Sequence, residues 1–158
     1  MSPTFVLLLA FLIGVVCGLR SLTAPAVVAW AAHLGWIHLD YARLHFLGST
    51  AAVAVFTLFA VVELVGDQLP YAPSRTAPPG LIARVVLGAL CGAALAVAGT
   101  QSFATGALLG VVGGISGAFG GYQVRTRLVK ALKVPDFVIA ILEDAVAIGA
   151  GIFVVTRF

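Results

Sequence analysis

Charge is what this sequence lacks most: only 9% of its 158 residues are Asp, Glu, Lys or Arg, whereas 61% are hydrophobic. Soluble globular domains carry roughly 25% charged residues, so this composition excludes an ordinary soluble domain and favours a membrane protein. The net charge is only +3 and the basic residues are scattered along the chain, which argues against nucleic acid as a partner.

Cysteine and the common catalytic motifs are also scarce. Cys17 and Cys91 lie in separate apolar runs without CxxC spacing or a cluster of histidines, so neither a zinc site nor a redox pair is expected. No nucleophile elbow, phosphate loop or HExxH motif occurs in the sequence. We therefore expect no enzyme activity, no metal and no cofactor.

Six apolar runs divide the chain, and most are near the roughly 20 residues that a helix needs to cross a bilayer. The runs cover residues 5–19, 22–37, 46–66, 80–99, 103–121 and 137–155. They predict an all-α, polytopic transmembrane bundle of five or six spans, forming a single domain over residues 1–158. The first run has no Lys or Arg before it, so it lacks the start of a signal peptide and is expected to be retained.

The second run, 22–37, is the ambiguous one. It is short and contains Pro25 and His33, so it is either a full crossing or a broken, re-entrant segment buried in protein. With six crossings, seven of the nine Lys and Arg residues lie on one side of the membrane, and with five crossings six of them do. Both alternatives put residues 123–134 in the cytoplasm of a bacterial inner membrane.

A proline-rich loop at residues 68–79 joins two halves, about 1–67 and 80–158. In the six-span alternative each half has three spans, and the halves have opposite orientations. This arrangement predicts an inverted repeat of the kind that many transporters use.

Four acids lie inside or at the edges of the apolar runs, namely Glu63, Asp67, Glu143 and Asp144. An ionisable side chain at membrane depth is costly unless it faces a partner, a cavity or a pathway. These acids are therefore candidates for binding a solute or an ion, with structural salt bridges as the alternative.

Two arginines are candidate partners for these acids. Arg20 interrupts the first apolar stretch, and it is either an interfacial residue or part of a broken helix lined by Arg20, Ser21 and Thr23. Arg125 falls on the apolar side of an amphipathic helix predicted over residues 123–134. We expect Glu143 or Asp144 to lie within salt-bridge reach of one of these arginines.

The opposite face of that amphipathic helix carries Arg127, Lys130 and Lys133, which we interpret as a solvated face or one that contacts lipid head groups. Glycines recur every four residues at Gly106, Gly110 and Gly114. Small residues at this spacing let helix backbones approach closely in lipid, so they predict either packing within the chain or a homodimer contact.

Several segments together resemble a bacterial membrane family known only as a domain of unknown function, number four-one-two-six. The resemblance rests on residues 18–21 (GLRS), 63–70 (ELVGDQLP), 77–80 (APPG) and 142–147 (LEDAVA). It implies a compact helical inner-membrane protein and adds weight to the four acids as the functional cluster. It implies no substrate.

Taken together, these patterns favour a small membrane protein that acts as a transporter or channel for a small solute or ion. One alternative is a non-catalytic scaffold whose charges only hold helices together. Another is a protein that binds lipid head groups through the basic helix.

Overall fold

The computed structural model describes residues 1–39, 43–67 and 77–158, and these form six α-helices, one short 3-10 helix and no strand. The α-helices are α1 (Pro3–Leu19), α2 (Thr23–His33), α3 (Thr50–Gly66), α4 (Pro78–Ala98), α5 (Phe103–Leu132) and α6 (Asp136–Val155), with the 3-10 helix η1 (His45–Gly48) before α3. The all-α prediction is confirmed for these residues.

Among the described residues, three helices are long and apolar enough to cross a membrane, and the prediction of five or six spans is not confirmed. They are α4, α5 and α6, with 21, 30 and 20 residues, and α1 and α3 are shorter apolar helices of 17 residues each. α2 has only 11 residues, so it is about 16 Å long and cannot cross a hydrocarbon core of about 30 Å by itself. Of the two alternatives for run 22–37, its length favours the broken, re-entrant segment.

Two helix boundaries differ from the predicted ones. Pro78 and Pro79, assigned to the loop, begin α4, because proline is well suited to the first turn of a helix. The rest of that loop, residues 68–76, lies outside the described residues. The amphipathic segment is the continuous end of α5, since no proline separates it from the apolar run before it.

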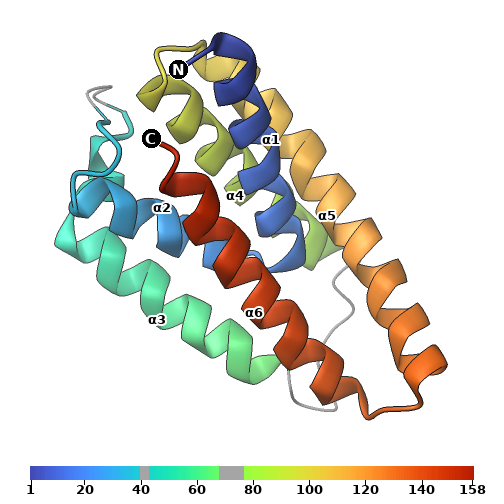
Figure 1. Ribbon diagram of the computed structural model, residues 1–158. Coiled ribbons are helices and arrows are strands. Elements are labelled where there is room, and N and C mark those ends of the chain that lie inside the picture. The colour runs from blue at the N-terminus through green and yellow to red at the C-terminus, as the bar shows by residue number, and fades with distance from the viewer. Residues whose placement is uncertain (40–42, 68–76) are drawn as a thin grey trace.

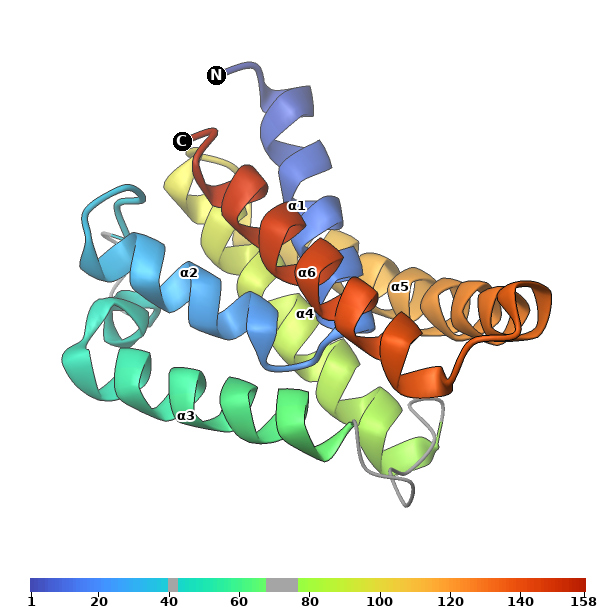
Figure 2. The same cartoon turned by 60° about the horizontal axis from the view of Figure 1, so that its bottom comes forward.

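The helices form a tilted bundle with α2 and α3 lying beside it as an antiparallel pair (Figures 1 and 2). Both termini and the α4–α5 turn lie at one end, and the α5–α6 turn projects at the other (Figure 1). α1 packs against α4 and α5, so helices from the two predicted halves interleave. Because α2 and α5 have 11 and 30 residues, the halves do not match in helix length, and the inverted repeat stays a prediction.

Glycines bring the backbones of α1, α4 and α5 into direct contact. A Cβ atom added at Gly110 would lie 2.0 Å from the carbonyl oxygen of Gly88 on α4, and one at Gly18 would lie 2.3 Å from that of Gly114. Close approach through small residues gives strong van der Waals packing where no water drives association. This packing fixes the level at which α1 ends relative to α4 and α5.

The same packing supports one of the two interpretations of the glycines. Gly106, Gly110 and Gly114 are buried against α4 within the chain, so they present no exposed surface through which a second copy could pack. The structure thus assigns them to packing within the chain, and these three positions give no support to a homodimer contact.

We predict that Gly110→Ala destabilises the protein by about 1–3 kcal/mol, because the new methyl group would meet backbone atoms that cannot move aside alone. Gly120→Ala is the matched control, since Gly120 lies in the same helix and has nothing within 4 Å of an added Cβ. Thermal unfolding in detergent measures both variants. Equal midpoints for the two would contradict the role given to the backbone contact.

Candidate functional site

The chain leaves the helical conformation between α1 and α2, and this break is the centre of the site. Arg20 is extended (φ −137°, ψ 113°), and its N–H closes α1 by donating to the carbonyl oxygen of Val16 over 2.9 Å. α2 then begins at Thr23 without a side-chain cap from its N-cap residue, Leu22. The uncapped start leaves backbone N–H groups that need acceptors from elsewhere.

Glu63, in the last turn of α3, supplies these acceptors. Its carboxylate accepts hydrogen bonds of 2.8 Å from the N–H groups of both Ser21 and Leu22, and a further bond from the Ser21 hydroxyl. A carboxylate at a helix N-terminus is also favoured by the helix dipole. Glu63 therefore caps α2 from a distant part of the chain.

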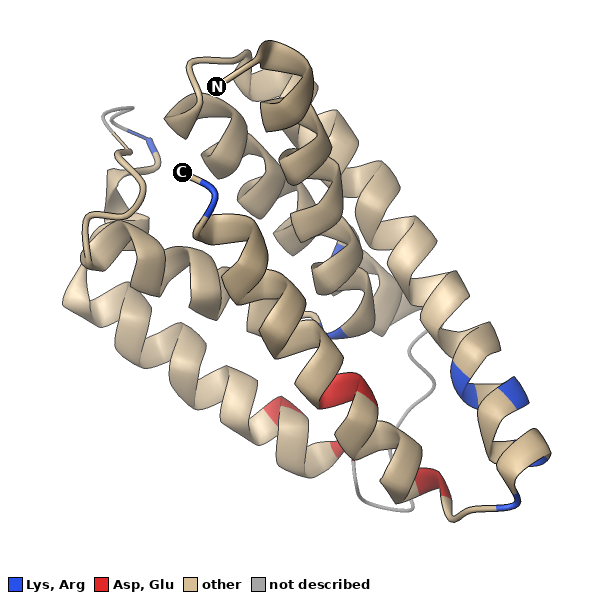
Figure 3. Ribbon diagram, in the orientation of Figure 1, with Lys and Arg blue, Asp and Glu red and all other residues tan. Residues whose placement is uncertain are grey.

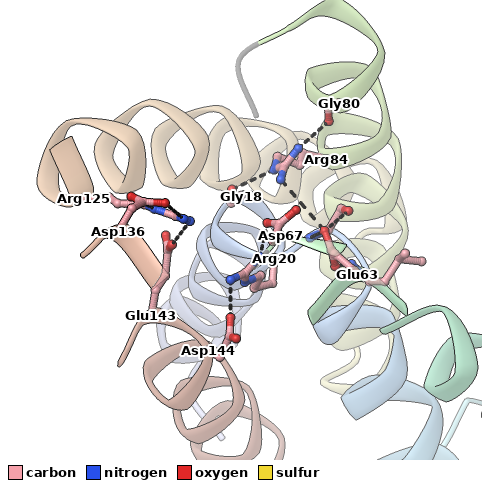
Figure 4. Close-up of polar contacts among 12 residues, drawn as sticks. Gly18, Arg20, Glu63, Asp67, Gly80, Arg84, Arg125, Asp136, Glu143 and Asp144 are labelled. Atoms are coloured by element: carbon pink, nitrogen blue, oxygen red, sulfur yellow. Dashed lines mark hydrogen bonds and ion pairs between the residues drawn. The ribbon is translucent and has the colours of Figure 1, made fainter. Parts of the chain in front are cut away.

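Arg84 lies on the other side of Glu63. Its Nε donates to the carbonyl oxygen of Gly18 over 3.0 Å, its Nη1 donates to that of Gly80 over 3.0 Å, and its Nη2 lies 3.9 Å from the Glu63 carboxylate. Arg84 thus joins the end of α1, the start of α4 and the end of α3 (Figure 4). Because α1 and α4 both pack closely against α5 through glycines, the Gly18 carbonyl is within reach of this side chain.

Arg20 is completely buried and forms ion pairs with two acids (Figure 4). One partner is Asp67, the residue that ends α3, and the other is Asp144 on α6. A buried guanidinium requires such compensation, because an unpaired charge in a low-dielectric interior costs several kcal/mol. Arg20 therefore connects the break to α3 and α6.

Arg125 makes an equivalent connection between α5 and α6. Its guanidinium binds Asp136, with 2.9 Å between Nε and one carboxylate oxygen, and its Nη1 lies 3.5 Å from Glu143. The prediction that Glu143 or Asp144 pairs with Arg125 or Arg20 is confirmed, since Glu143 pairs with Arg125 and Asp144 with Arg20. Glu143 and Asp144 are adjacent, so they link the two clusters of charge.

We call these eight side chains the ion-pair network; they are Arg20, Arg84, Arg125, Glu63, Asp67, Asp136, Glu143 and Asp144. All six α-helices contribute, α2 through the backbone at its start. Of the eight side chains only that of Asp136, at 62% relative exposure, is largely open. Asp and Glu gather on the facing ends of α3 and α6 (Figure 3).

The remaining predicted site residues fall into two groups. Ser21 belongs to the break and bonds Glu63, whereas Thr23 is buried nearby with a hydroxyl that has no hydrogen-bond partner among the described residues. Arg127, Lys130 and Lys133 lie outside the ion-pair network, exposed at the end of α5. Among the described residues, no group of three His, Cys, Asp or Glu side chains could hold a metal ion.

Two members of the network were missed from the sequence. Arg84 is a lone charge within the apolar run 80–99. The high cost of a charged side chain at membrane depth, which made Glu143 a candidate, applies equally to Arg84. Asp136 follows Pro135 at the first position of α6, where an acid is favoured by the helix dipole. Its partnership with Arg125 depends on the α5–α6 turn and had no signal in the sequence.

The family comparison agrees with the resemblance noted in the sequence. A family model described as "Domain of unknown function (DUF4126)" matches residues 7–157. The chain belongs to this family. The match includes every member of the ion-pair network. No curated protein and no solved structure matches the chain.

We predict that Arg20→Gln lowers the stability of the protein by about 3–5 kcal/mol, because it leaves Asp67 and Asp144 in the interior without their cation. Adding Asp67→Asn and Asp144→Asn to Arg20→Gln should restore much of this loss, since no buried charge is then orphaned. Lys130→Gln, at an exposed position, should leave the unfolding midpoint unchanged. If the triple variant is no more stable than Arg20→Gln, the unpaired carboxylates are not the cause of the lost stability.

Proposed function

We propose that this chain is a multi-pass protein of the bacterial inner membrane that moves a small solute or ion past the ion-pair network. One observation carries the proposal: all six α-helices meet at a buried set of charges beside a broken helix. Charges at membrane depth are expensive and commonly mark pathways for ions and solutes. Broken helices are a recurring way to line such a pathway with backbone groups.

The network also offers a means of movement. α3 packs mainly against α2 and η1, and its last turn is attached to the rest of the chain by Glu63 and Asp67. A proton or cation that neutralises these carboxylates weakens their hold on the α2 start and on Arg20. The end of α3 can then separate from the break between α1 and α2, which would open the site to one side of the membrane.

A structural tie is the second candidate function. Each acid in the network already has a partner in the structure, as expected for a scaffold whose charges only join helices. In that case the protein would serve as an accessory component without moving a solute. The two candidates differ in what the carboxylates do when their charge is removed.

Glu143→Gln separates the candidates, because the amide keeps the shape and hydrogen bonding of the acid but cannot ionise. If Glu143 takes part in a transport cycle, the variant should fold normally and lose flux. We would reconstitute the protein into vesicles and follow proton, Na⁺ and K⁺ gradients with entrapped indicator dyes. Lys130→Gln is the control, since Lys130 is an exposed charged residue outside the ion-pair network and its substitution should not alter flux.

Loss of stability with retained flux in Glu143→Gln would instead support the structural role. A Glu143→Gln protein with a lowered unfolding midpoint but unchanged flux per folded molecule would remove Glu143 from the pathway. A parent protein that carries none of the three ions faster than empty vesicles leak them would rule out ion movement as its activity.

The orientation of the chain follows from the same proposal. The α5 end carries Arg125, Arg127 and Lys130, whereas Arg157 lies beyond α6 at the end where both termini lie. Basic residues favour the cytoplasmic side, so we infer that residues 123–134 are cytoplasmic and that both termini are outside.

A cysteine at Lys130 should therefore resist an impermeant thiol reagent added to intact cells, and one at Arg157 should react. The native Cys17 and Cys91 are buried, so they contribute little background. Permeabilised cells should label at both positions. Rapid labelling of Lys130→Cys in intact cells would reverse the orientation.

A further inference from the structure

The end of α5 extends beyond what a bilayer can hold. α5 has 30 residues and is therefore about 45 Å long, whereas the hydrocarbon core is about 30 Å thick. Its residues 103–122 contain no Asp, Glu, Lys or Arg, and charge begins at Arg125. The last ten or so residues of α5 thus lie past the hydrocarbon, where the α5–α6 turn projects from the rest of the chain (Figures 1 and 2).

This projecting end has an uncovered apolar stripe. Val124, Leu128 and Leu132 are spaced four residues apart and are 57%, 39% and 57% exposed. Residues at this spacing share one side of a helix. Bulk water is a poor environment for such a stripe, whereas the boundary between head groups and acyl chains suits it.

The other side of the same helix end is basic. Arg127, Lys130 and Lys133 are exposed, and none of them has a carboxylate within ion-pair distance among the described residues. Residues 123–135 contain no acid, so the local charge is uniformly positive (Figure 3). Arg125 differs from these three, because Asp136 and Glu143 bind it and attach the helix end to α6.

We propose that residues 123–133 dock onto the anionic phospholipid head groups of the bilayer that holds the chain. The apolar stripe enters the boundary region, and the three free cations contact lipid phosphates. Each such cation contributes about a fivefold preference for an anionic over a neutral lipid. The inference uses the membrane embedding of the proposed function and is independent of solute movement.

Lipid-specific quenching tests this docking. A fluorophore on Leu132→Cys, in the full chain reconstituted into vesicles, is quenched by nitroxide-labelled phosphatidylglycerol or, separately, by nitroxide-labelled phosphatidylcholine. Docking predicts severalfold stronger quenching by the anionic lipid at low salt. The ratio should fall toward one in high salt and in Arg127→Gln/Lys130→Gln/Lys133→Gln, because screening or removing the charges removes the preference.

A fluorophore on Ala104→Cys is the matched control, since Ala104 is an exposed small residue near the other end of the same helix. It should show a ratio near one in every condition. A ratio near one at Leu132, or a raised ratio that neither salt nor the triple substitution lowers, would overturn the proposal. The salt series decides the matter even if the triple variant fails to fold.

The test also separates this inference from the membrane assignment and from a protein partner. Quenching at Ala104 but not at Leu132 would keep the chain in the bilayer and make the α5 end a soluble docking surface, for example for an acidic protein. Absence of quenching at both positions would reject membrane embedding itself.

Discussion

The buried guanidinium of Arg20 is the constraint on which the rest of the structure depends. It has no exposed surface, and it lies where α1 stops being a helix. Burial without compensation would cost several kcal/mol, a large part of the stability of a typical domain, so acids must converge on this point. Asp67 and Asp144 come from α3 and α6, and their pairing with Arg20 dictates how these helices approach the break.

Close glycine packing makes this convergence possible. In lipid, apolar side chains gain little by leaving the acyl chains for each other, so helices associate through backbone contact and polar links. Gly18 meets α5 at Gly114, and the same stretch of α1 presents the Gly18 carbonyl to Arg84. Packing and charge are therefore coupled: the small residues set the separation of the helices, and the ionic groups set their rotation and depth.

The sequence predicted the helical class, most apolar segments and the pairing of Glu143 or Asp144 with an arginine, because each rests on local composition and on the cost of a lone charge. It did not predict which acid pairs with which arginine, since that depends on how the helices are arranged. The role of Glu63 at the start of α2 also escaped prediction, as it joins residues about forty positions apart. Five or six spans are not confirmed, because hydropathy counts apolar residues regardless of where a helix begins and ends, and run 22–37 holds only a helix of 11 residues.

The cap that Glu63 provides has a consequence for how the chain is assembled. Three of the six described α-helices have a side-chain cap at their own N-terminus: Ser2, Ser49 and Ser102 each accept a hydrogen bond from an N–H in the first turn that follows. α2 has no such residue, and the N–H of its N-cap residue Leu22 instead donates to the carboxylate of Glu63 on α3. During synthesis α2 emerges well before Glu63, so its first turn stays unfinished until the later helix has folded back beside it. The break between α1 and α2 is thus a late product of assembly, completed only when the third helix arrives.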